Sequence, residues 1–417
     1  VREKINEHFI DNHHDVAFEN LDIIENSYGT WANYGTTDEW NSMRNFLIQN
    51  DMSQGQNYQL AETLIDMDSW INYLVVELYA GNNDWIGGNY KRWYTPEHKW
   101  RFILFDLDAG FNQYPEEYNP PDENIFENSA LNGGFHEYFQ LIVNSEFKNQ
   151  FINTFADLFN TSFDPVYLTS IIDSLSQVIY QEMPYHIDRW ENTCTYCPSN
   201  WIGDGINSME EWDEELNRLY EFADIRYEVG WDNLIDEFDL GGTVNINLLE
   251  QNNLGKIKLN SIVPNDYPWE GKYFIGTTIT LNPVPKFDNQ FLHWIINDQE
   301  IIYEEKLVLH LDSQDLAPDS TIFIEAVYST GPPNERSVVI NEINYNSSDD
   351  YNAGDWIEVF NNSDSTIDLS NWIIKDDNDE HFFEFTINEI ILSGEFLVIC
   401  RDSTSFKNIY PDVNNVR

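Results

Sequence analysis

The sequence has little cysteine, little positive charge and no long hydrophobic run. Three cysteines are too few for a disulfide-stapled scaffold in a chain of 417 residues. No stretch of about 18 apolar residues occurs, so we expect no membrane-spanning segment. Basic residues number 21 against 73 acidic ones, a formal net charge of −52, and a field of that sign argues against nucleic-acid binding.

The acidic residues are spread along the chain rather than gathered in a tail. We interpret most of them as a solvated surface; the alternative, cation binding, would need particular carboxylates. Hydrophobic residues make up 41% and aromatic residues 15%, enough for sizeable cores, and the length predicts two or three domains. The chain starts at Val1 and stops at Arg417 in mid-pattern. We expect truncation at both ends, so the lack of a signal peptide says nothing about export.

Residues 1–240 are predicted to be mainly helical. The segment 66–80 has an acidic, Ser-containing start and apolar residues at helical spacing, and Gly81 follows as a stop signal. One β signal interrupts the helices, because two aromatic-rich runs, 89–94 and 99–105, flank a proline-bearing turn and predict a hairpin. Further helices are expected over 136–160, 165–184 and 208–238.

The loop and hairpin after this helix contain the sharpest candidate site. Phosphoryl transfer needs a carboxylate that orients the attacking hydroxyl and oxygen ligands that hold Mg²⁺ against the phosphates. Asp84 and Asn89 have the spacing of such a loop in protein kinases, and Asp106 follows the second hairpin strand, where a metal-binding Asp belongs. Asp108 is a second acidic candidate. Residue types alone favour turn and strand-end roles for these side chains.

The segment resembles the catalytic core of the spore-coat protein H (CotH) kinases, atypical kinase-fold enzymes that transfer phosphate from ATP to protein Ser. The resemblance is carried by Asn83-Asp84-Trp85 with Asn89, then Lys99-Trp100-Arg101 and Phe105-Asp106-Leu107-Asp108. It implies Asp84 as the catalytic Asp, and Asn89, Asp106 and Asp108 as ligands of Mg²⁺ or Mn²⁺ beside ATP. It also implies a secreted or surface substrate protein with a Ser or Thr acceptor. His186, Arg189 and Arg226 also fall where family members have similar residues, and we interpret them as structural, as interior or packed side chains.

The resemblance covers residues 1–240 and implies the C-lobe portion of a kinase-like domain. A kinase N-lobe with a phosphate-gripping Lys should precede it, but the basic residues before Asp84 are only Arg2, Lys4 and Arg44. We therefore expect a fragment that lacks the N-lobe, holds half an ATP site and is inactive alone. True absence of the lobe is the alternative.

Short β-branched and aromatic runs separated by turns follow residue 240, which predicts sandwiches or barrels. Residues 241–330 resemble small β modules of exported Bacteroidetes-type CotH proteins. Residues 337–417 resemble the lamin-tail domain, an immunoglobulin-like sandwich, without its final strands. The expected fold is therefore multidomain α+β, a mainly helical kinase-like C-lobe followed by two all-β immunoglobulin-like domains. Export to the cell surface or medium is expected.

Several interpretations stay open. The chain could be a non-catalytic pseudokinase-like adhesion protein whose β modules bind a partner or polysaccharide, with Trp269 and Trp294 as a sugar platform or as core. A glycosidase would pair Asp84 with Asp106 at about 5–9.5 Å. A Ca²⁺ site would use Asp84, Asp106 and Asp108. In the last domain, a polar rim is favoured over cation binding for Glu342, Asp355 and Glu358.

Cys194 and Cys197 have the spacing of a redox or metal motif. Zinc requires four ligands, no second Cys pair exists, and His186 is distant in sequence as a third ligand. A local disulfide that staples the loop 191–205 is the favoured interpretation. Cys400 lies in an apolar run and is predicted to be a small buried hydrophobic residue.

Overall fold

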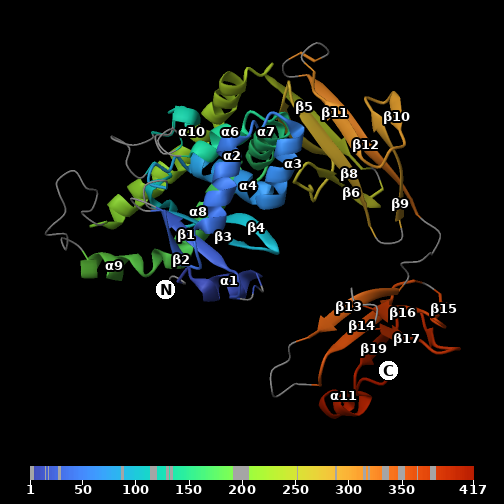
Figure 1. The fold of residues 1–417 in the computed structure, drawn as a ribbon. Helices are drawn as coiled ribbons and strands as arrows, with labels where there is room; N and C mark the ends of the chain where they lie inside the picture. Colours follow the sequence, from blue (N-terminus) through green and yellow to red (C-terminus); the bar gives the residue numbers. More distant parts are fainter. Residues whose placement is uncertain are drawn as a thin grey trace.

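A computed structural model gives the fold, which is a helical N-terminal region with small sheets followed by a strand-rich C-terminal part (Figure 1). The structure describes residues 4–417 except 15, 17, 27–29, 86–88, 113–119, 128–130, 132–134, 191–205, 251, 287–288, 313–315, 318–319, 331–337, 346–352, 364 and 376–381. The mixed α+β class predicted from the sequence is confirmed at this level. Among the described residues, every helix is too short or too polar to cross a membrane.

The N-terminal region is mainly helical, as predicted. Its helices are α1 (Glu7–His14), α2 (Asp38–Gln49), α3 (Gly55–Leu64), α4 (Met67–Ala80), α6 (His136–Leu141), α7 (Ser145–Phe159), α8 (Pro165–Tyr180), α9 (Met183–Trp190) and α10 (Met209–Phe238). Of these, α4, α6 with α7, α8 and α10 fall in the predicted ranges, whereas α1, α2, α3 and α9 were not predicted individually. The predicted helix 136–160 is two helices, because the Asn144 side chain caps α7 by accepting hydrogen bonds from the N–H groups of Glu146 and Phe147. Short 3₁₀ turns are η1 (Leu107–Ala109) and η2 (Ile125–Glu127).

A four-stranded antiparallel sheet lies within the helical region. Its strands are β1 (Asp22–Asn26), β2 (Thr30–Tyr34), β3 (Tyr90–Thr95) and β4 (His98–Ile103), in the order β2-β1-β3-β4. The predicted hairpin is confirmed as β3 and β4. The prediction of a single β signal in this region was wrong, since β1 and β2 also pair there. Each has only five residues, and β1 pairs with β3 from a distant part of the chain, so no local pattern reveals them.

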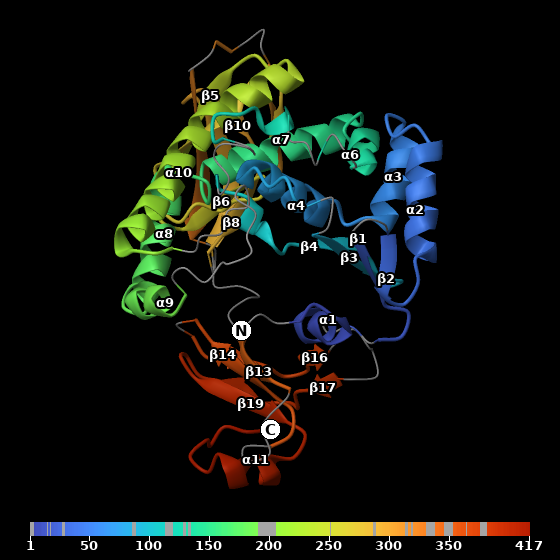
Figure 2. The same ribbon diagram turned by 90° about the vertical axis from the view of Figure 1, so that its left-hand side faces the viewer.

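Helix α4 is the buried centre of this region and lies beside β4 in two perpendicular views (Figure 1 and Figure 2). Its ends have the signals that the sequence predicts: Asp66 accepts a hydrogen bond from the Ser69 N–H, and Gly81 ends the helix at a left-handed φ of 64°. Aromatic rings fix it to the hairpin, with Tyr73 stacked on Phe102 at a centroid distance of 4.4 Å. The loop that follows α4 therefore starts from a rigid support.

The chain continues into two sheets. One has the order β10-β9-β12-β5-β7 and the other β11-β8-β6. The strands are β5 (Thr243–Leu249), β6 (Gly255–Leu259), β7 (Trp269–Phe274), β8 (Thr278–Pro285), β9 (Asn289–Ile296), β10 (Glu300–Ile302), β11 (Leu307–His310) and β12 (Thr321–Thr330). Trp294 is fully buried, so its role is in the core rather than on a sugar platform.

The last part of the chain has small sheets with the orders β13-β14-β19, β15-β18 and β16-β17. Cys400 ends β19 as a free, half-buried cysteine, and its Sγ donates to the Arg417 carbonyl. The elements are β13 (Val338–Asn344), β14 (Trp356–Asn361), β15 (Ile367–Asp368), β16 (Ile373–Lys375), β17 (Phe382–Glu384), β18 (Ile390–Ile391), β19 (Phe396–Cys400) and α11 (Ser403–Ile409).

Candidate active site

The loop after α4 holds Asp84 through a short chain of hydrogen bonds. Asn82 is fully buried, and its amide nitrogen donates to the Glu77 carboxylate at 2.9 Å. Its amide oxygen accepts from the Asp84 N–H at 3.0 Å. Asp84 Oδ2 then accepts from the Asn89 side-chain nitrogen at 3.0 Å. The predicted pair Asp84 and Asn89 is therefore in direct contact, and its backbone is anchored to a buried carboxyl group on α4.

Asp106 lies three residues after the second hairpin strand, directly before η1. Its backbone is left-handed, with φ 61° and ψ 50°, a conformation that Asp tolerates better than most residues and that is frequent at functional turns. The turn is tied to the end of α4, because the Phe111 N–H donates to the Ala80 carbonyl at 2.7 Å. The α4 C-terminus therefore supports both the Asp84 loop and the turn that holds Asp106 and Asp108.

The three aspartates act on one another electrostatically. Partial desolvation raises the pKa of Asp84 above its ordinary value, and the charges of Asp106 and Asp108 raise it further. The hydrogen bond from Asn89 acts in the opposite direction. The predicted carboxylates therefore share one region of negative charge, a setting that attracts cations.

Glu77 is the site residue that the sequence reasoning missed. It has no exposed surface, and burial raises its pKa to about 7, against the lowering effect of the Asn82 hydrogen bond. The sequence did contain a signal for it, a glutamate within an otherwise apolar helical segment. Buried carboxylates are rare and often lie at functional sites. Asn82 was likewise inside the candidate segment but received no role.

A cavity of about 730 Å³ opens beside Asp106 and Asp108. Its wall also includes Phe105, Lys91 on β3 and Asn33 on β2, together with residues from the N-terminal segment and the end of the hairpin: Lys4, Ile5, Phe9, Ile103, Leu104 and Leu107. The cavity is large enough for a ligand of nucleotide size. Acidic and basic side chains meet in it.

The candidate metal ligands are mainly oxygen donors. The amide nitrogen of Asn89 is used by Asp84, so coordination by Asn89 would use its amide oxygen, and the carboxylate of Asp106 is the other candidate donor. Such donors suit Mg²⁺, which keeps several waters and phosphate oxygens among its ligands. No group of three or more His, Cys, Asp or Glu side chains suited to a metal occurs in the described part of the chain, neither at Asp84, Asp106 and Asp108 nor at Glu342, Asp355 and Glu358.

The residues expected to be structural divide into two groups. Arg226 is buried, and its guanidinium donates to the carbonyls of Pro120 and Glu123. His186 and Arg189 are exposed on α9, so an interior role was wrong for both. Cys194 and Cys197 lie outside the described residues.

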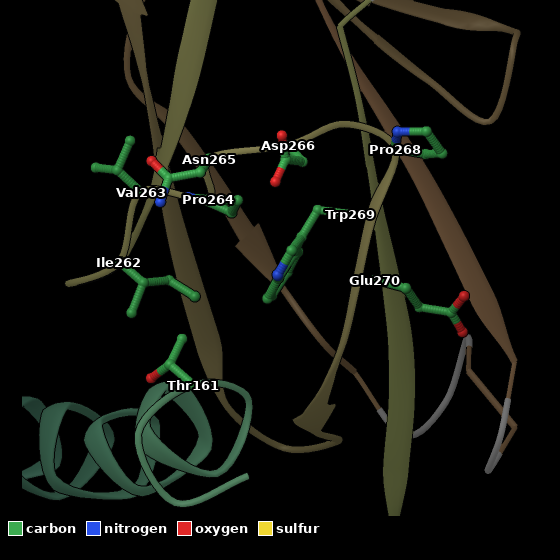
Figure 3. A pocket seen from close by; sticks show the side chains of 9 residues that line it. All are labelled: Thr161, Ile262, Val263, Pro264, Asn265, Asp266, Pro268, Trp269 and Glu270. Carbon is green, nitrogen blue, oxygen red and sulfur yellow. The ribbon is translucent and has the colours of Figure 1, made fainter. Parts of the chain in front are cut away.

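A second pocket, of about 360 Å³, lies in the strand-rich part (Figure 3). The half-buried indole of Trp269 lies at its centre, with Asn265 and Asp266 along one side and Glu270 next to Trp269 on β7. Trp269 thus lines an open surface, unlike Trp294.

Comparison with known proteins found two similarities along the chain. Residues 3–229 match the sequence model of a family described as CotH kinase protein. Residues 331–416 match the Lamin Tail Domain. The first match contains Asp84, Asn89, Asp106 and Asp108, and the second contains β13 to β19, which make up an immunoglobulin-like domain. No curated protein matches the chain.

Proposed function

The chain belongs to the CotH kinase protein family, and we propose that its N-terminal region transfers the γ-phosphate of ATP to a Ser or Thr hydroxyl of a protein. The observation that carries the proposal is the paired support of Asp84 and Asp106. The Asp84–Asn89 contact and the Asp106 turn are both fixed to the C-terminal end of α4. Phosphoryl transfer relies mainly on such positioning and on charge stabilisation.

Asp84 would accept a hydrogen bond from the substrate hydroxyl and orient its oxygen toward the γ-phosphate. The raised pKa of Asp84 brings its carboxylate closer to the pH at which a general base works well. Asn89 and Asp106 would hold Mg²⁺ or Mn²⁺, with Asp108 as an additional carboxylate at the same turn. The ion, when bound, supplies charge neutralisation on the phosphates. In this scheme residues 1–240 form a kinase-like C-lobe.

The substrate would be a secreted or surface protein, and the chain itself would work outside the cell. Few cysteines and strong negative charge are compatible with that setting, and the lamin-tail domain would present or anchor the catalytic region. The sheets of residues 241–330 would form a second immunoglobulin-like sandwich.

Carbohydrate binding by residues 241–330 is a second candidate function, alone or beside the kinase activity. The supporting observation is the Trp269 pocket, which combines an accessible indole with amide and carboxylate groups (Figure 3). Aromatic faces with neighbouring polar groups suit sugar rings. A pseudokinase-like adhesion protein would show this binding without nucleotide binding.

Calorimetric titration with ATP and Mg²⁺ tests the kinase proposal. We expect the chain to bind the nucleotide only when the metal is present, and Asp106→Ala to weaken binding by more than about tenfold, because it removes a metal ligand. Asp224→Ala, at an exposed acidic residue of α10, is the matched control and should bind like the wild type. A wild-type chain that ignores millimolar ATP would overturn the proposal and favour the adhesion protein.

A further inference from the structure

The cavity beside Asp106 and Asp108 has a basic wall as well as an acidic one. Lys91 lies two residues after Asn89, on β3, and its side chain lines the cavity. Lys4 also lines it but is exposed in the N-terminal segment. Lys91 therefore comes from the same hairpin that links Asn89 to Asp106.

The ammonium group of Lys91 is held in place. Its Nζ lies 3.3 Å from Glu25 Oε2 on β1, and the Lys91 side chain is only 14% exposed. Glu25 Oε2 also accepts a hydrogen bond from the Asn33 side chain on β2 at 2.7 Å. The same Nζ lies 4.9 Å from the centroid of the Phe105 ring, one residue before Asp106. Glu25 on β1 and Phe105 beside the Asp106 turn thus contact Lys91 directly, and Asn33 on β2 holds Glu25 in place.

A nucleotide would need such a cation here. Asp84, Asp106 and Asp108 share a negative region, and the chain as a whole has a formal charge of −52. A triphosphate entering this field is repelled unless fixed positive charge is available nearby. Protein kinases solve the same problem with a phosphate-binding Lys that a Glu holds in an ion pair.

We propose that Lys91 contacts the phosphates of the bound nucleotide and that Glu25 is the residue that positions it. This inference rests on the proposed kinase function. It also changes the expectation that a phosphate-gripping Lys must precede Asp84, because β3 delivers one from downstream. The pairing of β1 with β3, which places Glu25 opposite Lys91, makes this possible.

The simpler role for these residues is a cross-strand ion pair that stabilises the sheet. Opposed charged residues contribute roughly 0.2–1 kcal/mol to a sheet in this way. That role would affect thermal stability and would leave nucleotide affinity unchanged. Affinity for ligands with different numbers of phosphates therefore separates the two roles.

The experiment compares ATP and AMP binding, each with Mg²⁺, for the wild type, Lys91→Met, Lys91→Arg and Glu25→Gln. Lys148→Met, at an exposed lysine of α7, is the control. We expect Lys91→Met to weaken ATP binding by about 10–100-fold and AMP binding by much less, because a charged contact to the outer phosphates is lost. Lys91→Arg should restore most of the affinity, and Glu25→Gln should give an intermediate loss. Lys148→Met should behave as the wild type.

The outcomes distinguish the two proposals. If the wild type fails to bind ATP, the proposed function fails first. If the wild type binds ATP and Lys91→Met binds it equally well, the kinase proposal stands and the role of Lys91 is overturned. An equal loss of ATP and AMP affinity would also overturn it. If the melting curve of Lys91→Met shows that it does not fold, the ATP and AMP affinities of Glu25→Gln and Lys91→Arg decide between the two roles in the same way.

Discussion

The single residue that connects the core to the candidate site is Glu77. Its carboxylate is fully buried at the C-terminal end of α4 and receives the Asn82 side chain, which in turn accepts the Asp84 N–H. A buried carboxyl group of this kind costs stability when it is ionised. We explain the presence of Glu77 by its effect on Asn82, which it holds by a hydrogen bond so that Asn82 can position Asp84. An apolar side chain could not fix Asn82 in the same way.

Replacing Glu77 with Gln should change the pH dependence of stability. Burial raises the pKa of Glu77 to about 7 in the folded protein, above its value in the unfolded chain. The contribution of Glu77 to the free energy of unfolding is therefore fully present below the unfolded pKa, and it is lost as the pH rises through about 7. Glu77→Gln retains an acceptor for Asn82 without this charge. The free energy of unfolding of the wild type should therefore fall by up to about 3 kcal/mol, relative to that of the variant, between pH 4.5 and 8.

Calorimetric melting of both proteins across this pH range measures the effect of Glu77. The relevant transition is the one that Glu77→Gln shifts, because a multidomain chain need not melt in one step. Asp224→Asn is the control for loss of an exposed carboxylate and should follow the wild type. If the melting temperatures of the wild type and Glu77→Gln change with pH in parallel, the predicted effect of Glu77 ionisation on stability is contradicted.

Among the secondary-structure elements, the Asp106 turn depends on a close approach to α4. Gly110 ends η1, and a Cβ added there would lie 2.9 Å from the Ala80 carbonyl oxygen and 3.1 Å from the Ala80 Cβ. Both atoms belong to the helix end that also leads into the Asp84 loop. A glycine is therefore needed at this position for space, and the turn cannot move away without displacing Asp106.

Gly110→Ala should push the turn away from α4 and weaken the candidate site. We expect a loss of stability of about 1–3 kcal/mol from overpacking. We also expect affinity for ATP with Mg²⁺ to fall by about tenfold. Gly55→Ala is a matched control, because no atom lies within 4 Å of a Cβ added at Gly55. Unchanged nucleotide affinity in Gly110→Ala would show that the turn position does not matter for binding.

The elements that the sequence predicts are those with local signals. Helix α4 was predictable from Asp66 and Gly81 at its ends, and the hairpin from its aromatic strands and turn. The spacing of Asp84 and Asn89 is likewise a local signal, and the structure brings their side chains into contact. The roles of these residues, and those of Asp106 and Asp108, stay predictions.

The features that sequence reasoning missed have three different causes. The Glu25–Lys91 pair requires β1 to align with β3, and the sequence gives no register for that pairing. The position of Glu77 relative to Asp84 depends on the path of a loop rather than on helical periodicity. The separation of α6 from α7 depends on one capping side chain, Asn144, inside an otherwise continuous helical pattern.

On the scale of the whole molecule, α7 joins the helical region to the following sheets. Asp157 is buried on α7 and accepts hydrogen bonds from the Tyr273 hydroxyl, the Ser261 N–H and hydroxyl, and the Asn260 side chain. Asn149 and Asn153 of the same helix donate to the Thr278 carbonyl. Buried apolar side chains also continue from the helical region into the sheets as one core.

Asp157→Ala should uncouple these two regions. The substitution leaves the Tyr273 hydroxyl and the Ser261 N–H without their acceptor, at a cost of roughly 2–4 kcal/mol. We expect the transition shared by the helices and sheets in wild-type calorimetry to split into two. Asp232→Ala, at an exposed position of α10, is the control. A single unshifted transition in Asp157→Ala would contradict the proposed coupling.

The most direct test of the central claim is transfer of labelled phosphate from [γ-³²P]ATP, with Mg²⁺, to a library of peptides that each contain one Ser or Thr. We expect the wild type to label a subset of them, in contrast to the inactive fragment expected from the sequence, because Lys91 would supply the phosphate-binding cation that was assigned to a preceding lobe. Asp84→Asn should reduce the rate by about 10²–10⁴-fold while retaining nucleotide binding, because Asp84 orients the hydroxyl rather than the phosphates. Asp224→Asn should transfer phosphate at the wild-type rate. A wild type that binds ATP but labels no peptide, or an Asp84→Asn variant as active as the wild type, would contradict the assignment of Asp84 as the catalytic residue.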